Sequence, residues 1–289
     1  ARFGDYASPQ YGTIKSSENY ERRFIMTFPN ETLPKGRKQK TTALYDRFVN
    51  QGAVMGDSFG LENVLWFANN KEDAHEEPTI KRSRSHDYVS REVINVRENV
   101  GLIEVANFSK HEFKGTDARK FLDHVMAGKL PKPGRISLSP MLSYRGKLCG
   151  DLTVACFDEN EFMVFGSGAA QEMHRRWFES HLDKFDVNYK NRSDEFHGIS
   201  IAGPNSRKVL EKIVRDDVSN EKFKFRDSRR MFVGGVPAII NRISFTGELG
   251  YEIYVAPHYQ IKLYEELMEA GKEFNIKPFG GRALMSMRL

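Results

Sequence analysis

Two acidic residues stand inside segments that otherwise have the composition of buried strands. Asp151 lies in the apolar run 148–154, and Glu252 alternates with Tyr251 and Ile253. Burying a carboxylate is costly unless a cation or hydrogen-bond donors meet it. A strand carboxylate is well shaped to accept two parallel hydrogen bonds from an amidine-like N–H pair, as on a guanine or pterin edge. These two residues are therefore the first candidates for chemistry.

Each carboxylate also has a purely structural interpretation. Asp151 could cap a bulge beside Gly150 or face solvent on an edge strand, and the sequence does not separate these alternatives from a functional role. Glu252 could pair with Arg242 across a hairpin, and strand periodicity by itself favours that pairing. Both alternatives stay open when the residues are considered alone.

The familiar catalytic and metal-binding sequence patterns are absent. Gly166-Ser-Gly168 lacks the third glycine of a dinucleotide fingerprint, so a turn is the better interpretation. Walker A, Gly-x-Ser-x-Gly and His-Glu-x-x-His patterns do not occur. The eight histidines never pair with Cys or a carboxylate at metal-ligand spacing, so we expect no metal site.

Composition excludes several classes of protein. The 289 residues carry 44 Lys and Arg against 39 Asp and Glu, and the resulting net charge of +5 is dispersed along the chain. Dispersed charge is not typical of a nucleic-acid-binding face, so we expect no nucleic-acid partner. No run approaches about 18 consecutive apolar residues, so we expect no membrane span. Two cysteines and a start without an apolar core indicate a reducing compartment and a protein that is not secreted.

The order of strands and helices predicts an α+β fold with mixed, largely antiparallel sheets and packed helices. Strands come in pairs joined by tight turns, as at 136–143 and 148–157 around Gly146, and helices interrupt them. A parallel sheet would require strict alternation of strand and helix, which is missing. Residues 1–40 show little periodicity and are expected to form an extended arm, and Thr116 is expected to cap a helix.

The second half of the chain repeats this arrangement. Strands are expected over 238–245 and 251–255, joined by an acidic tip between two glycines, Gly247 and Gly250. Residues 282–289 have a helical pattern with no stop signal after it. We therefore expect the chain to be a piece of a longer protein.

Several segments, in order along the chain, resemble one known family. Together they are similar to the folate-binding domain of the glycine cleavage T-protein, an aminomethyltransferase. The ends of the chain are similar to the C-terminal half of dimethylglycine and sarcosine dehydrogenases. The first set of segments is 101–110, 115–123, 150–154, 201–204 and 244–254, and the second set is 47–56, 60–67 and 279–289.

This resemblance implies a fold and a division of the chain. Residues 86–289 would form a T-protein-like folate-binding region, with sub-domains at about 86–195 and 196–289. Residues 1–85 would form an arm or connector with the first helices. The final β-barrel segment of the T-protein would be absent from this chain.

The resemblance also implies an activity. The chain would be the tetrahydrofolate-binding, one-carbon-accepting part of an FAD-linked N-demethylating dehydrogenase that forms 5,10-methylenetetrahydrofolate. An FAD domain of the same polypeptide would oxidise a small N-methyl amine and so supply the one-carbon unit. The location would be cytoplasmic in a bacterium and the mitochondrial matrix in a eukaryote.

Family site residues carry over onto matching positions of this sequence. Asp151 matches the acidic residue near the reacting folate nitrogens, and Glu252 matches the carboxylate that grips the amino-pyrimidine edge of the pterin. The hairpin has Phe245 where the family has a pocket Tyr, and Ser167 stands near the position of a family Asn. The remaining implied folate contacts are Leu152, Thr153, Tyr254 and Arg282, of which Arg282 is the nearest match to the family's folate-contacting Arg.

Three other functions stay possible from the sequence. One is a stand-alone folate-dependent aminomethyltransferase or demethylase of the T-protein type. Another is a folate-binding assembly factor without turnover, although its cysteine-containing signature is missing here. The third is a subunit-interaction module in which Phe245 and the other departures mark a site that has lost its activity.

Overall fold

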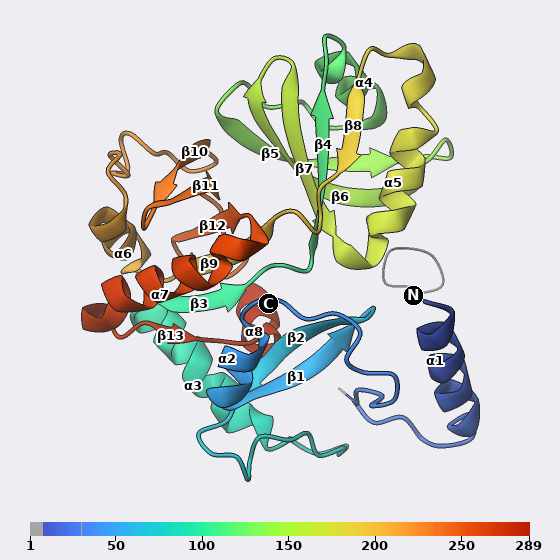
Figure 1. The fold of residues 1–289 in the computed structure, drawn as a ribbon, viewed down its shortest axis with the longest axis vertical. Coiled ribbons are helices and arrows are strands. Elements are labelled where there is room, and N and C mark those ends of the chain that lie inside the picture. The colour runs from blue at the N-terminus through green and yellow to red at the C-terminus, as the bar shows by residue number, and fades with distance from the viewer. Residues whose placement is uncertain (1–7, 30) are drawn as a thin grey trace.

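The computed structural model describes residues 8–29 and 31–289, whose strands form three sheets of two, six and five strands. Figure 1 shows these sheets as three lobes around the C-terminal helix. The paired strands run antiparallel, except that β13 runs parallel to β3. The expected α+β fold with largely antiparallel sheets is confirmed, and no closed barrel occurs in this part of the chain.

The two-stranded sheet is a tight hairpin that packs beside helices. Phe59 and Gly60 take positive φ values of 55° and 98° at its turn, the backbone conformation that a two-residue hairpin loop needs. Trp66 on the hairpin packs 5.0 Å from the ring of Tyr88 on a neighbouring helix. The elements of this lobe are α1 (Pro9–Glu21), α2 (Tyr45–Asn50), β1 (Ala53–Ser58), β2 (Leu61–Phe67), α3 (Ser85–Glu98) and α8 (Gly281–Arg288).

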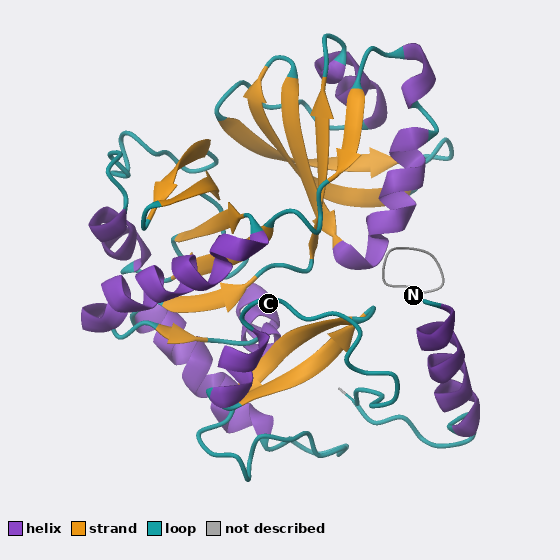
Figure 2. Ribbon diagram, in the orientation of Figure 1, coloured by secondary structure: helices purple, strands orange, loops and turns teal. Residues whose placement is uncertain are grey.

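The six-stranded sheet has the strand order β10-β11-β12-β9-β3-β13, and α6 and α7 cover its outer face (Figure 2). Alternate residues of β12, such as Tyr251 and Ile253, pack under these helices against Leu210 and Leu263. The elements are β3 (Gly101–Glu104), β9 (His197–Ala202), α6 (Ser206–Ile213), β10 (Ser228–Val233), β11 (Val236–Asn241), β12 (Gly250–Val255), α7 (Gln260–Gly271) and β13 (Lys277–Pro278).

The five-stranded sheet has the order β5-β6-β7-β4-β8. Phe113 of this sheet packs edge-on against Phe178 of α5, with ring centroids 5.0 Å apart, and α4 adds Phe121 to the same core. The elements are β4 (Phe108–Lys114), α4 (Ala118–Val125), β5 (Arg135–Leu142), β6 (Leu148–Asp158), β7 (Glu161–Ser167), α5 (Gln171–Glu179) and β8 (Asn188–Asn191); short 3₁₀ turns occupy Gly168–Ala170, Leu182–Lys184, Pro257–Tyr259 and Lys272–Phe274.

The two larger sheets face each other across a shared core. Because successive side chains of a strand point to opposite faces, each sheet has one face under its helices and one toward the other sheet. Ile239 and Tyr254 from the six-stranded sheet pack in one cluster with Ala155, Met163 and Phe165 from the five-stranded sheet. We call the two faces that point toward each other the inner faces. The candidate site lies on them.

The structure corrects three local expectations. Part of the predicted extended arm is helix α1, which Ser8 caps by accepting a hydrogen bond from the Tyr11 amide at 2.9 Å. Residues 1–7 and 30 of that arm lie outside the described residues. Thr116 does not cap α4, because its hydroxyl donates to Asp186 at 2.8 Å. The strand expected over 238–245 ends at Asn241, and a loop follows.

No helix that the structure describes combines the length and the apolar character needed to cross a bilayer.

Candidate functional site

A row of polar side chains crosses the inner face of the six-stranded sheet. Directly paired residues point to the same face of a sheet, so the strand register puts them in one line. All members are buried, although the surrounding inner face is mostly apolar. Unpaired polar groups cost free energy when buried, so such a row marks a candidate site. This polar row consists of Ser228, Asn241, Glu252 and Ser200, on β10, β11, β12 and β9.

Glu252 is the charged member of the polar row, and only half of its carboxylate is engaged. The Tyr254 hydroxyl donates to Oε2 at 2.8 Å, and within residues 8–29 and 31–289 Oε1 accepts no hydrogen bond. Burial raises the pKa of Glu252 to about 7. Near neutral pH the carboxyl is therefore partly ionised, and in the ionised form its free oxygen can accept from a ligand N–H group.

Asn241 lies directly opposite Glu252 in the strand register. Its Oδ1 accepts a hydrogen bond from the Ser228 hydroxyl at 2.7 Å, while its Nδ2 is buried without a partner. A free acceptor on Glu252 beside a free donor on Asn241 can hold a ring edge that presents N–H groups and a carbonyl oxygen side by side.

The pairing of Glu252 with Arg242 across a hairpin, which was the structural alternative, is not observed. Strand β11 ends at Asn241, so Arg242 has no place in the register opposite Glu252. The Arg242 guanidinium donates instead to the Phe223 carbonyl at 2.5 Å and to Asn220 at 2.7 Å.

Tyr254 joins the polar row to the five-stranded sheet. Its ring stacks on Phe165 of β7, with centroids 4.6 Å apart. Burial and the neighbouring Glu252 raise the pKa of Tyr254 well above its ordinary value, so the hydroxyl stays a donor to that carboxylate. The stack therefore fixes the orientation of the Glu252 carboxylate.

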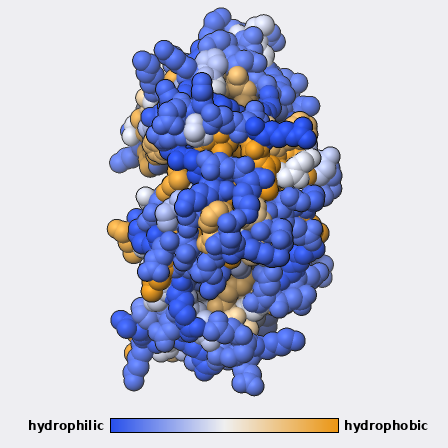
Figure 3. All heavy atoms as spheres, turned by 90° about the vertical axis from the view of Figure 1, so that its left-hand side faces the viewer, coloured by the Kyte–Doolittle hydropathy of each residue, from blue (hydrophilic) through white to orange (hydrophobic). Residues whose placement is uncertain are grey.

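A separate cavity of about 470 Å³ lies beside Tyr254. It reaches Tyr254 and Ala256 but not Glu252, and Met163, Phe232 and Ile239 give it apolar walls. Figure 3 shows apolar side chains gathered at the level where the two larger lobes meet, on the face that carries β10 and β11.

Asp151 lies on the facing sheet with its side chain exposed. It pairs with Pro140 of β5, and a bulge lies nearby at Cys149, beside Gly150. Its side chain faces solvent although β6 is an inner strand of the sheet and not an edge strand. Thr153, on the same face, pairs with Phe165, which stacks on Tyr254. Asp151 and Thr153 thus border the space between the sheets, and in the described part of the chain no hydrogen bond or ion pair engages the Asp151 carboxylate.

Two other predicted residues take different positions. Leu152 points to the opposite face of β6 and is fully buried in the core under α4 and α5. Phe245 is 40% exposed in the loop after β11, with its ring 5.9 Å from Phe108 and the Arg288 guanidinium 5.1 Å from its ring centre. Phe245 therefore lies at a rim where β4 and α8 approach the loop.

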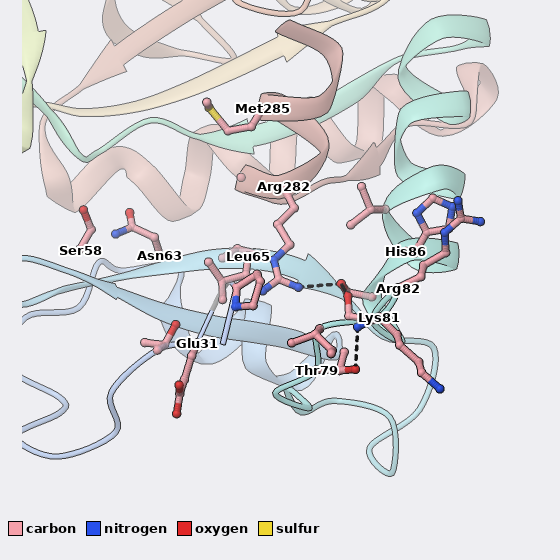
Figure 4. A pocket seen from close by; sticks show the side chains of 18 of the residues that line it. Glu31, Ser58, Asn63, Leu65, Thr79, Lys81, Arg82, His86, Arg282 and Met285 are labelled. Atoms are coloured by element: carbon pink, nitrogen blue, oxygen red, sulfur yellow. Dashed lines mark hydrogen bonds between the residues drawn. The ribbon is translucent and has the colours of Figure 1, made fainter. Parts of the chain in front are cut away.

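Arg282 lines a different cavity, of about 810 Å³, between β2, α3 and α8 (Figure 4). Its guanidinium donates to the Ser85 hydroxyl at 2.6 Å and pairs with Glu76 at 3.0 Å. Lys81 and Arg82 also line this cavity and give it a cationic character. The structure thus does not bring Arg282 to the polar row.

Sequence reasoning missed Asn241 and Lys110. Lys110 is fully buried on β4, where it pairs with Phe165 and so points toward the inner face. Its surroundings in the sequence, between His111 and Ser109, do not distinguish it from a surface lysine. The only available signal was strand alternation, which does not reveal which face a second sheet covers.

The histidines and acidic residues described by the structure form no cluster of three or more that could hold a metal ion.

The family model for the GCVT N-terminal domain matches residues 44–289. The chain belongs to this family. Its fold is also that of a solved relative, the glycine cleavage system aminomethyltransferase T from Bartonella henselae. That structure matches with a TM-score of 0.71 and 21% identity, over 86% of this chain and 62% of the other. The resemblance inferred from the sequence is confirmed.

Individual relatives match different shares of the chain. Mitochondrial dimethylglycine dehydrogenase from Homo sapiens is 34% identical over all of this chain and 34% of its own length. An aminomethyltransferase from Thermoanaerobacter pseudethanolicus is 30% identical over 67% of this chain and 53% of its own length. The chain thus spans about a third of the length of the dimethylglycine dehydrogenase that it matches.

Proposed function

We propose that this chain is the reduced-folate-binding, one-carbon-accepting part of an FAD-linked N-demethylating dehydrogenase of the dimethylglycine or sarcosine type. The observation that carries the proposal is the half-engaged Glu252 carboxylate beside the unpartnered Asn241 amide. A pterin presents adjacent N–H groups and a carbonyl oxygen along one edge, which complements this donor and acceptor set.

Similarity over the whole chain supports the dehydrogenase type over a free-standing aminomethyltransferase. The human dimethylglycine dehydrogenase matches all 289 residues, whereas the bacterial aminomethyltransferase matches 67% of them. FAD would belong to another part of the same polypeptide and would oxidise the N-methyl amine there. The mitochondrial relative supports a matrix location in a eukaryote, and a bacterial protein would be cytoplasmic.

In this proposal the residues of the two inner faces have different roles in binding the folate and in proton transfer. Glu252 holds the amino-pyrimidine edge, and Tyr254 fixes the orientation of the Glu252 carboxylate. When bound, tetrahydrofolate supplies the nitrogens that take up the one-carbon unit as 5,10-methylenetetrahydrofolate. Asp151 would exchange a proton near those nitrogens and stabilise developing positive charge. Thr153 would line the ring between these carboxylates.

The remaining predicted contacts lie away from the polar row or face the core. Phe245 would offer its ring at the rim but no hydroxyl. Leu152 would contribute through the backbone, because its side chain is in the core. A folate contact from Arg282 stays a prediction, since Ser85 and Glu76 engage its guanidinium.

A calorimetric titration of the intact gene product with tetrahydrofolate under anaerobic conditions tests this function. We expect saturable binding that Glu252→Ala weakens at least tenfold, equivalent to about 1.4 kcal/mol. Glu248→Ala is the matched control, because Glu248 lies in the preceding loop and pairs with Arg97 at 2.7 Å. Equal affinity of wild type and Glu252→Ala, or no binding by the wild type, would refute the folate site and leave an interaction module.

A further inference from the structure

Lys110 is a buried cation that the proposed folate chemistry does not use. It is fully buried at the start of β4, where the chain leaves the six-stranded sheet for the five-stranded one (Figure 1). Its ammonium donates to the Ala106 carbonyl at 2.9 Å and reaches the Ser193 carbonyl at 3.5 Å. Burying a charge is costly, and a neutral donor could make the same two contacts. The charge itself therefore calls for an explanation.

The charged groups around Lys110 come from every element that packs on it. Glu252 and Tyr254 face it from β12, and its ammonium lies 5.8 Å from the Tyr254 ring centre. Glu104 of β3 faces it as well, and Gln260 links Glu104 to His197. Asp194 and Lys40 lie at the rim, and His111 is the next residue on β4.

Lys110 and Glu252 depend on each other for their charged states. Burial lowers the pKa of Lys110 to about 7, and the carboxylates of Asp194, Glu104 and Glu252 oppose that shift. Burial likewise raises the pKa of Glu252 to about 7, and the Tyr254 hydroxyl and the Lys110 ammonium oppose that shift. Near neutral pH, each charge therefore stabilises the other.

We propose that Lys110 is a positioning residue of the folate site, whose buried ammonium favours the ionised form of the Glu252 carboxylate, the form that accepts a ligand N–H group through its free oxygen. This inference rests on the proposed folate-binding function. Without the Lys110 charge, a larger fraction of Glu252 is protonated in the free site at pH 7. The ligand edge can then bind only after that proton leaves to solvent, so binding weakens and regains strength as the pH rises.

The test compares the dissociation constant of 5-formyltetrahydrofolate, a stable reduced folate, between pH 6 and 9 in wild type, Lys110→Met and Lys110→Gln. With the pKa of Glu252 raised by about one pKa unit from about 7, we expect binding to Lys110→Met to be about tenfold weaker at pH 6, about fivefold weaker at pH 7 and within about twofold of wild type at pH 9. Lys110→Gln can still donate to the two carbonyls, so it separates the loss of charge from the loss of those contacts. Lys114→Met removes a surface ammonium from the same strand and should leave the pH profile unchanged.

A second readout separates this inference from the folate proposal. The Glu252 carboxyl carbon can be titrated by NMR without ligand, with Glu252→Gln used to assign its signal. A higher titration midpoint in either neutral Lys110 variant supports the inference even if no folate binds. If wild type binds folate and the neutral variants keep its pH profile and its midpoint, Lys110 has only a structural role and the inference is overturned.

Discussion

Three carboxylates on regular elements differ in their surroundings: Asp151 is exposed, whereas Glu252 and Glu92 are buried. The exposed Asp151 is free to meet a ligand from solvent. Burial raises the pKa of Glu252, and the Tyr254 hydroxyl and the Lys110 ammonium oppose that rise. Within the described residues, Glu92 has no cation beside it, and its hydrogen bonds come from the backbone amides of Phe67 and Gly280.

Glu92 makes stability depend on pH. Its two oxygens accept from the amides of Phe67 at 2.7 Å and Gly280 at 2.9 Å, yet burial raises its pKa to about 7. The folded chain therefore keeps this proton where the unfolded chain, with a pKa near 4.5, has lost it. The stability from Glu92 is full below pH 4.5 and falls as pH rises toward 7, by at most about 1.4 kcal/mol per pH unit.

Urea unfolding of wild type and Glu92→Gln at pH 5, 6, 7 and 8 measures this effect. We expect the variant to be less stable at pH 5, because one amide loses its acceptor, and to gain on wild type as pH rises. Glu98→Gln, an exposed position on the same helix, serves as the control. Parallel stability curves for wild type and Glu92→Gln would contradict the assignment.

At the scale of elements, the position of α8 depends on a close backbone approach. Gly280 precedes the helix, and a Cβ there would lie 2.2 Å from the Leu65 carbonyl oxygen and 2.5 Å from the Trp66 nitrogen. The same residue donates its amide to Glu92. This contact holds α8, with Arg282 and Arg288, against β2 and α3.

Gly280→Ala should therefore destabilise the chain by about 2–4 kcal/mol, because backbone atoms cannot move aside as a flexible side chain can. Gly281→Ala is the matched control, since its Cβ would meet only the Val64 carbonyl, at 3.5 Å. Alanine also favours helix at that position, so the control should be neutral or slightly stabilising. Thermal unfolding of both variants checks the difference, and similar losses in the two would rule out the close-approach argument.

Strand pairs such as β5 with β6 could be predicted, because the alternation of apolar and polar residues indicates two strands and Gly146 indicates the tight turn between them. The hairpin of β1 and β2 was not predicted, since Phe59-Gly60 is not a typical turn pair. The polar row could not be predicted either. Glu252 could be identified because it is a carboxylate inside an apolar strand. Its neighbour Asn241 could not, because their contact depends on the register between two strands. Lys110 depends on which face a second sheet covers, which is also a tertiary property.

At the scale of the whole molecule, the apolar cores cross the boundaries between the lobes. Leu44 and Phe48 of the hairpin lobe share one cluster with Ile253 of the six-stranded sheet. Val96 of α3 and Ala283 of α8 share another with both larger sheets. The chain also passes directly from β3 in one sheet to β4 in the other. Removal of residues 1–85 would leave the first of these clusters without Leu44 and Phe48.

Shared cores predict that the lobes unfold together, and the two tryptophans can report on this separately. Trp66 lies in the hairpin lobe and Trp177 on α5 beside the five-stranded sheet. In Trp177→Phe the fluorescence follows only Trp66, and in Trp66→Phe only Trp177. We expect the urea transition seen by fluorescence to coincide with that seen by circular dichroism in each variant, as for one cooperative unit. If the Trp66 signal changes at lower urea than the circular dichroism of the same variant, the N-terminal lobe unfolds on its own. The 1–85 division of the chain would then describe a real folding boundary.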